Sequence, residues 1–464
     1  MLRTIINTFV NCFKIPELKS RILYTLMVLA ICRVVSMIPL PGLNGAALSA
    51  YFDEQARRQQ GGGLLGMYSM FTGGALERCA VGSLGIMPYI SATIIIQLLT
   101  AVLPRLAKLA REEGGRIKLV QYGRYLTVPL CLGQGLVMAV GWENASTLFP
   151  GFDQRLVMYG EGMIWWYRIQ TAIILTTGTL LLMWFGEQIS ERGIGNGVSL
   201  VITIGILARL PQAAVGLSDM FMPGQGIESN FNLFHAVGMV LLLLGVVAGV
   251  IAVTQAQRKI AVQYAQRAIG RRVVAGGTSY LPLRVNYAGV MPIIFAQAIL
   301  MFPQKILQFI GGSHVKLGFL KRFADHSLRE GDPVYLILYG LMILFFSYFW
   351  VATQFNEVQI ADDLKKYGGY IPGVRPGAAT TEFLHRAMSR ITLAGAIFLT
   401  IIAVIPIMLY GWTKVPYAVA QFFGGTSLLI LVGVMLDTMR QMESHLLMRN
   451  YDGFLKKGRL RGRF

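Results

Sequence analysis

Charged residues are scarce in this sequence. Only 14% of the 464 residues are charged, whereas 54% are hydrophobic. A soluble protein of this length needs more charged side chains than that to cover its surface. The low charge therefore excludes an ordinary soluble protein and indicates that much of the surface faces lipid.

Cysteine and histidine are also rare, with four and five residues. The cysteines show neither CxxC spacing nor a regular framework, so we expect packing roles for them and no metal or redox site. They are Cys12, Cys32, Cys79 and Cys131. The sequence contains no Ser/His/Asp arrangement, no HExxH helix and no Walker loop. An enzyme is therefore disfavoured, and we expect no cofactor.

Ten apolar stretches are each long enough to cross a membrane, for which a helix needs about 20 mainly apolar residues. They lie at approximately 21–40, 80–102, 119–141, 163–185, 195–214, 233–254, 285–304, 334–353, 391–411 and 417–437. We therefore expect an all-α, polytopic membrane protein, with about ten transmembrane helices in one integrated bundle.

In the apolar cores of these stretches few ionisable residues stand out, and they include Arg33, Arg124, Arg168 and Asp437. An ion-coupled transporter generally needs intramembrane carboxylates or histidines to bind or relay its ions. The composition thus disfavours a secondary transporter, although ten spans with glycine interruptions keep this hypothesis open. A membrane scaffold without a pore is the other alternative.

Positive charge is distributed unevenly between the two sides of the predicted bundle. With the N-terminus inside, segments on that side carry 28 of the 42 basic residues, whereas the opposite loops carry nine. This is the positive-inside pattern, so both termini should be cytoplasmic. For most of these residues, orientation of the protein is the simplest interpretation.

Two predicted cytoplasmic loops carry more basic residues than the orientation of the protein in the membrane requires. The loop at 255–284 has six basic residues and no acidic residue, which suits a large, negatively charged partner. The loop at 354–390 contains GGYIPGVRPG, in which two Pro-Gly pairs bracket Arg375 and favour turns on both sides of it. We expect this guanidinium to stand at a stiff loop tip.

Residues 61–77, GGGLLGMYSMFTGGALE, are too short and rich in glycine to span a membrane, yet too apolar for a solvated loop. We expect a short helix between glycine hinges. Buried in a bundle, it would be a re-entrant element, which protein or a water-filled cavity must surround. A packing element and a movable stopper both fit. Its apolar residues are Leu64, Leu65, Met67, Tyr68, Met70 and Phe71.

Several long motifs resemble the SecY/Sec61-alpha family of protein-conducting channels. They are LGIMPYISATIIIQLL at 84–99, GEQISERGIGNGVSL at 186–200, SYLPLRVNYAGVMPIIFAQAIL at 279–300, ADDLKKYGGYIPGVRPG at 361–377 and FGGTSLLILVGVMLDT at 423–438. They cover much of the chain in the family's order, and a run such as GEQISERGIGNG is too specific to arise from membrane composition alone.

The resemblance implies two five-helix halves in inverted orientation around an hourglass pore. It divides the chain into a cytoplasmic N-terminal amphipathic segment (1–20), an N-terminal half (21–214), a C-terminal half (215–438) and a basic cytoplasmic tail (439–464). The 61–77 segment corresponds to the family's plug. A ring of branched side chains at the pore's waist falls on Ile86, Ile90, Val198, Ile202, Ile294 and Ile430. The ring resists ions because water leaves a narrow apolar neck.

The family also has a lateral gate between spans two and three and spans seven and eight, where we place Ser91, Gln97 and Gln297. The implied partners are SecE and SecG, the SecA ATPase, the ribosome, preprotein substrates and the lipid bilayer, with SecDF and YidC as further candidates. For docking of SecA or ribosomal RNA, the resemblance indicates Arg258, Lys259, Arg271, Arg272 and Arg375. The implied location is the bacterial plasma (inner) membrane.

Overall fold

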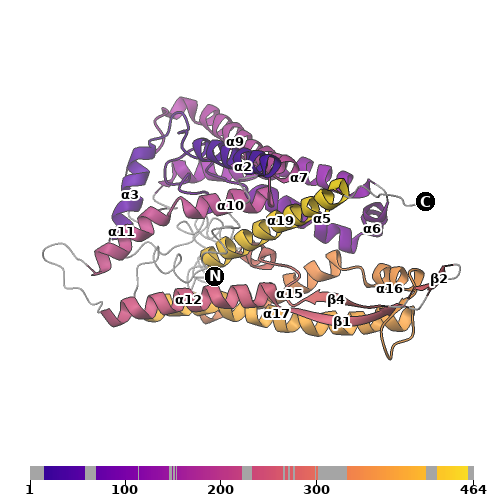
Figure 1. Ribbon diagram of the computed structural model, residues 1–464. Helices are drawn as coiled ribbons and strands as arrows, with labels where there is room; N and C mark the ends of the chain where they lie inside the picture. Colours follow the sequence, from indigo (N-terminus) through magenta and orange to yellow (C-terminus); the bar gives the residue numbers. More distant parts are fainter. Residues whose placement is uncertain are drawn as a thin grey trace.

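The computed structural model of the chain is mainly helical (Figure 1). It describes residues 15–57, 69, 71–112, 114–145, 149, 152, 154–221, 233–264, 267–269, 272–274, 277–297, 299–300, 332–413 and 426–457.

Among the described residues of the first part of the chain, all of the longer regular elements are helices. Its elements are α2 (Pro16–Val35), α3 (Gly45–Arg57), α5 (Met87–Val102), α6 (Pro104–Arg111), α7 (Gly115–Glu143), η1 (Glu161–Met163), α9 (Ile164–Arg192), α10 (Gly197–Leu207) and α11 (Leu210–Phe221).

The second part adds strands to helices. Its helices are α12 (Leu233–Gln255), α15 (Pro333–Gln354), α16 (Glu357–Lys366), α17 (Ala378–Thr413) and α19 (Thr426–Lys457). Its strands are β1 (Gln257–Tyr264), β2 (Arg267–Ile269), β3 (Arg272–Val274), β4 (Thr278–Arg284) and β5 (Gly369–Tyr370).

Proline marks the start of several helices. Residues Pro16, Pro88, Pro104 and Pro333 stand in the first turn of α2, α5, α6 and α15. A proline is tolerated there because the first N–H groups of a helix have no partner within the helix. At Pro104 the new helix also changes direction, since α5 and α6 meet at 105°.

The predicted count of ten membrane spans can be compared only with the helices of the described residues. In the described part of the chain, six helices are long and apolar enough to cross a membrane, or seven if the bent pair α5 and α6 is one span. The count of ten is therefore not confirmed. Helices α2 and α19 coincide with predicted spans but carry charged residues, and the stretch predicted at 285–304 is described only to residue 300, with 291–297 and 299–300 helical.

One large hydrophobic cluster, the bundle core, joins the two parts of the chain. It includes Leu29 of α2, Leu182 of α9, Val250 of α12, Ile343 of α15 and Leu429 of α19. In Figure 1, α19 lies between the upper helices α7 and α9 and the lower helices α12 and α17. It packs against both α10 and α12.

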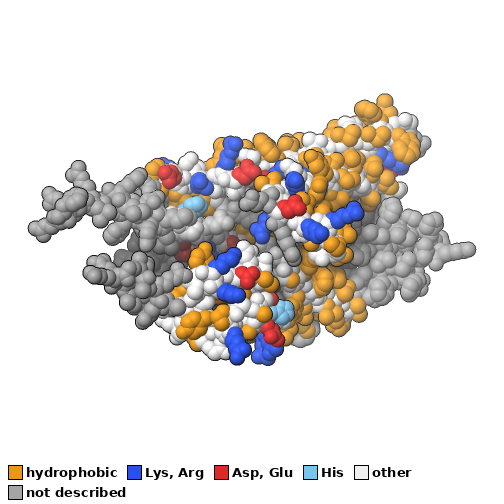
Figure 2. Space-filling view, turned by 90° about the vertical axis from the view of Figure 1, so that its right-hand side faces the viewer, with side chains coloured by type: hydrophobic (Ala, Val, Ile, Leu, Met, Phe, Trp, Pro, Cys, Tyr) orange, Lys and Arg blue, Asp and Glu red, His pale blue; other side chains and the backbone are white. Residues whose placement is uncertain are grey.

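The outward faces of the same helices are also apolar. Leu241 of α12, Ile337 of α15 and Trp165 of α9 are each more than half exposed. A helix that is hydrophobic on all sides is buried in protein or lies in lipid. Charged side chains gather instead on the end of the molecule that carries α6 and α16 (Figure 2).

A small sheet replaces two of the predicted loops. Strand β1 pairs antiparallel with β4, from Gln257 opposite Arg284 to Gln263 opposite Thr278, and its other edge pairs with β5. Strands β2 and β3 form a second antiparallel pair. The described chain is mainly helical, as predicted, and strand pairing joins the described parts of the segments 255–284 and 354–390.

This unit has a hydrophobic core of its own. We use the name sheet unit for β1, β4, β5, α16 and the adjoining ends of α15 and α17. Its core contains Ile260 and Val262 of β1, Leu283 of β4, Phe355 after α15 and Leu384 of α17. Helices α15 and α17 continue from this core into the bundle core, where they contribute Ile343 and Leu399, among others.

Candidate functional site

The described end of the predicted stopper lies inside the bundle. Residues Leu64, Leu65, Met67, Tyr68 and Met70 lie outside the described residues. The rest of the segment is enclosed, because Phe71 is 8% exposed, Ser69 and Leu76 are fully buried, and Thr72 and Ala75 are also buried. The described end of a segment that is too short and rich in glycine to span is thus surrounded by protein, as a re-entrant element must be.

Tight turns carry the chain from this segment into α5. Gly73, Gly74 and Gly85 have φ values of +65°, +83° and +59°, which glycine adopts at no steric cost. At Gly73 a side chain is also excluded by space, since a Cβ atom there would lie 3.0 Å from the Cα atom of Gly205 in α10. These turns explain why the predicted span at 80–102 becomes helical only at Met87.

Two arginines from other elements hold this segment. Arg33 of α2 donates a hydrogen bond to the carbonyl oxygen of Gly73. Arg209, in the turn between α10 and α11, donates to the hydroxyl of Ser69 and forms an ion pair with Glu77. The side chains of Arg209 and Glu77 are only 16% and 11% exposed, so the ion pair is largely removed from solvent.

Neither Arg209 nor Glu77 is among the site residues predicted from the sequence. Arg209 falls within the predicted fifth span, and an arginine in a membrane segment is by default a candidate functional residue with a partner to be found. That signal was present in the sequence. The partner was not recognisable, because Glu77 lies 132 residues away along the chain.

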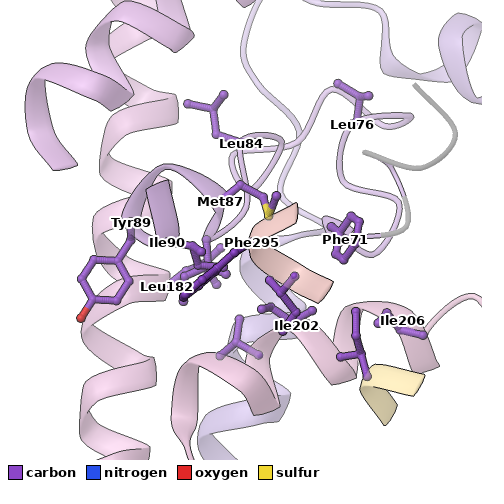
Figure 3. Packing of buried hydrophobic residues seen from close by; sticks show 14 of the residues in the cluster. Phe71, Leu76, Leu84, Met87, Tyr89, Ile90, Leu182, Ile202, Ile206 and Phe295 are labelled. Carbon is purple, nitrogen blue, oxygen red and sulfur yellow. The ribbon is translucent and has the colours of Figure 1, made fainter. Parts of the chain in front are cut away.

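The six residues predicted for the pore ring all belong to the bundle core. Ile86, Ile90, Ile202, Ile294 and Ile430 are between 0% and 4% exposed. The sixth, Val198, is half-buried and packs against the same cluster. Figure 3 shows Ile90 and Ile202 in this cluster with Phe71, Leu182 and Phe295. The ring and its role as a constriction stay predictions.

A small pocket joins the stopper to the ring. It has a volume of about 20 Å³ and is lined by Phe71, Thr72, Ile86, Val201 and Arg33, among others. This volume is sufficient for about one water molecule. The described end of the 61–77 segment and the predicted ring residue Ile86 therefore line the same small space.

The residues predicted for the lateral gate have different surroundings. Ser91 is half-buried, and its hydroxyl donates 3.1 Å to the carbonyl oxygen of Met87 within α5. Gln97 is half-buried on the same helix, whereas Gln297 is 2% exposed. Nearby, Phe295 contacts Phe346 of α15 at a ring distance of 5.9 Å. The assignment of these three residues to a gate stays a prediction.

The GEQISERGIGNG motif brings α9 and α10 into close contact. A Cβ atom at Gly197 would lie 1.8 Å from the carbonyl oxygen of Gly186, so no larger residue fits at Gly197 without movement of the backbone. The Gly197 N–H donates to the hydroxyl of Ser190 at 2.9 Å, and Asn196 caps α10 by accepting from the Ser199 N–H at 3.3 Å.

The same motif ties α9 and α10 to more distant helices. The N–H of Ile194 donates to the hydroxyl of Thr25 in α2 at 3.1 Å. The N–H of Gly195 donates to the side-chain oxygen of Gln441 in α19 at 2.8 Å. The motif therefore acts through its backbone, as a junction of four helices, and its Gly-rich loop shows no phosphate-binding setting.

Ionisable residues of the bundle occur mainly in pairs. Arg168 forms two hydrogen bonds with Glu143, at 2.8 and 2.7 Å. Arg124 donates to Glu187 at 2.8 Å. Each of these carboxylates, like Glu77, is thus neutralised by an arginine. Among the described residues, no group of three or more His, Cys, Asp or Glu side chains could hold a metal ion.

The predicted docking residues that are described lie on the surface. Arg258 and Lys259 are exposed at the start of β1, and Arg375 is exposed between two turns. Gly373 and Gly377 have φ values of +82° and +103°, as the two Pro-Gly pairs predict. Arg271 lies outside the described residues, and only the backbone of Arg272 is described, in β3.

Comparison with known proteins gives consistent similarities. The family model described as SecY matches residues 80–439. The protein translocase subunit SecY of Chlamydia trachomatis is 43% identical over 460 residues, covering 98% of this chain and 99% of that protein. A solved SecY structure, whose description assigns its plug domain a role in stabilising the closed channel, matches with a TM-score of 0.59 and 18% identity over 92% of each chain. Canine Sec61 in a ribosome-channel complex matches with a TM-score of 0.56 and 16% identity over 92% of each chain.

Proposed function

Since the chain belongs to the SecY family, we propose that it is the central channel subunit of a protein translocase and conducts unfolded secretory polypeptides across the membrane. The observation that carries this proposal is the position of the described end of the 61–77 segment. This end is enclosed in the bundle beside Ile86, and Arg33 and Arg209 hold it there. A segment in this position closes a path that its displacement opens.

The ring and the stopper limit leakage in different ways. Ile86, Ile90, Val198, Ile202, Ile294 and Ile430 form an apolar neck, from which water withdraws, so ions meet a dewetting barrier. The aliphatic side chains adapt to a polypeptide that passes between them. The 61–77 segment adds a second barrier beneath the neck when no polypeptide is present.

Hydrophobic segments of the substrate leave the channel sideways, through a lateral gate near Ser91, Gln97 and Gln297. Transfer of apolar surface from water to lipid releases about 25 cal/mol per Å². A sufficiently apolar segment therefore partitions into the bilayer by itself once the gate opens, without further energy from the channel.

The channel is a multi-pass membrane protein, and we place it in the bacterial plasma membrane with both termini in the cytoplasm. The excess of basic residues on the side of the sheet unit supports this orientation, because cytoplasmic loops retain Lys and Arg. The bacterial source of the curated SecY relative supports the location.

The sheet unit is the proposed docking surface for the SecA ATPase and the ribosome. Its exposed Arg258, Lys259 and Arg375 suit an acidic or phosphate-rich partner. Contacts with ribosomal RNA should weaken as salt concentration rises, because phosphate binding releases counterions. SecE and SecG complete the assembly. The channel itself is not an enzyme, and ATP hydrolysis is supplied by the partner.

Reconstituted vesicles test this function. With the channel, SecE, SecG, SecA and ATP present, a fluorescently labelled preprotein should become protected from external protease. Vesicles without ATP serve as the control. Protection that does not depend on SecA and ATP, or no protection at all, would contradict the proposal.

A secondary transporter is supported less well. Such a protein needs carboxylates that are free to bind an ion within the membrane. Glu77, Glu143 and Glu187 instead each form an ion pair with an arginine. Uptake of a small solute driven by its own gradient, without a partner protein, would favour the transporter.

A further inference from the structure

The contacts of Arg33 and Arg209 converge on one short segment from two separate elements. Arg209 reaches both Ser69 and Glu77, which lie at the two ends of the described part of the stopper. Arg33 reaches the carbonyl oxygen of Gly73, midway between them. The segment is thus held at three points by two guanidinium groups that lie outside it.

The position of Arg209 follows from a break in the helical path. Helix α10 ends at Leu207 and α11 begins at Leu210, so Arg209 lies in the intervening turn. Its N–H donates to the carbonyl oxygen of Ile206 at 3.1 Å, and its own carbonyl accepts from the Ala213 N–H at 3.1 Å. The backbone is therefore fixed, and the side chain extends from a rigid base.

The surroundings strengthen the ion pair between Arg209 and Glu77. Because both side chains are little exposed, water screens the attraction weakly. Removal of one partner leaves a charge with no counter-ion in the protein interior, which is strongly unfavourable. If the segment moves out of the bundle, water hydrates both charged groups, and the cost of burying an unpaired charge disappears.

We propose that Arg209 and Arg33 form a clamp that sets how readily the described end of the stopper, Ser69 and residues 71–77, leaves the bundle, with the Arg209–Glu77 ion pair as its main contact. This inference rests on the proposed function and adds its regulation. The apolar contacts of Phe71 and Leu76 position the segment, and the clamp determines the resting leak of the channel.

The first test breaks the ion pair and measures leakage. Glu77→Gln and Arg209→Gln should each raise the rate of chloride or potassium efflux from vesicles about tenfold, which corresponds to about 1.4 kcal/mol. The exchanged pair, Glu77→Arg with Arg209→Glu, should return efflux toward the original rate, because the glutamate can also accept from the Ser69 hydroxyl.

A matched control uses an ion pair that does not touch the segment. Glu143→Gln removes the partner of Arg168, which lies on α9 and is paired at 2.7 Å. Efflux should stay at the original rate. An increase equal to that of Glu77→Gln would overturn the clamp, since any broken ion pair would then have the same effect.

Deletion of residues 61–77 separates this inference from the proposed function. The deletion should itself cause leakage, and Arg209→Gln added to the deletion should cause no further increase, because its partners are gone. If the deletion leaks but Glu77→Gln does not, the clamp is wrong and the stopper stands. If the deletion does not leak, the stopper is wrong, and with it the clamp. Elution as a single species in detergent verifies that each variant is folded.

Discussion

The bundle and the sheet unit place their charges in opposite positions. In the bundle, the pair of Arg209 and Glu77 points inward and is largely buried, while apolar side chains cover the outside. In the sheet unit, the pair of Arg386 and Glu382 is 70% and 63% exposed, and the interior is apolar. The two regions thus distribute charged and apolar side chains differently, because the outer surface of the bundle is in contact with lipid and that of the sheet unit with water.

This difference predicts where a substitution acts. In lipid, the hydrophobic effect does not drive helices together, because the lipid tails are as apolar as the core. Close contacts between backbones and a few buried polar groups therefore determine how the helices of the bundle pack. In the sheet unit, burial of side chains in its own core provides the stability. Four substitutions, in decreasing order of their effect on folding, test the comparison.

The largest effect is expected at the contact between α9 and α10. Gly197→Leu should destabilise the folded state by about 4 kcal/mol or more, because its Cβ atom alone would collide with the backbone of Gly186. The yield of folded protein in detergent measures this effect. Gly238→Ala in α12, where no atom lies within 4 Å of the added Cβ, is the control and should leave the yield unchanged.

A second large effect is expected in the core of the sheet unit. Leu384 is fully buried, so Leu384→Ala should cost about 3 kcal/mol. Faster proteolysis of the segment 255–284 would report this loss, and the bundle should resist the protease as before. Val358→Ala, at a site that is 59% exposed, should not change the rate. Equal loss of resistance in the bundle would show that the two cores unfold together.

A small effect is expected for the exposed ion pair of the sheet unit. Glu382→Gln should change stability by about 0.3 kcal/mol, because Arg386 and Glu382 form an i, i+4 pair that water screens. Thermal unfolding of the purified protein should shift by less than the error of most such measurements. A shift as large as that of Leu384→Ala would mean that this pair is not a solvent-screened contact.

The smallest effect on folding is expected at Arg375, which is exposed at the loop tip. Arg375→Glu should alter stability by less than about 0.3 kcal/mol. SecA-driven import of a preprotein should nevertheless fall several-fold, because the reversed charge repels an acidic docking surface. Unchanged import by Arg375→Glu would contradict the docking role of this loop, whereas unfolded protein would contradict its exposed position.

Much of the helical framework was predictable from the sequence. Apolar length alone placed spans at 163–185 and 334–353, close to the observed α9 and α15. Local chemistry also predicted the turns around Arg375, since Pro-Gly pairs determine the backbone without help from distant residues. Both features depend on residues that are neighbours in the chain.

The features that were not predicted depend on distant residues. The clamp requires Glu77 to meet Arg209, and no local pattern specifies such a contact. The sheet requires β5 to pair with β1, about a hundred residues earlier. A partial signal existed for β1, where buried Ile260 and Val262 alternate with less buried residues at the two-residue period of a strand. The high positive charge of this segment instead favoured a loop.

Helices α15 and α17 cross the boundary between the two cores without interruption. Helix α17 (Ala378–Thr413) is one helix of 36 residues, about 54 Å long at 1.5 Å per residue. It begins among the residues that pack on β1 and ends among those around α12. For a partner docked on the sheet unit, as proposed above, these two continuous helices are a direct mechanical connection from the docking surface to the bundle.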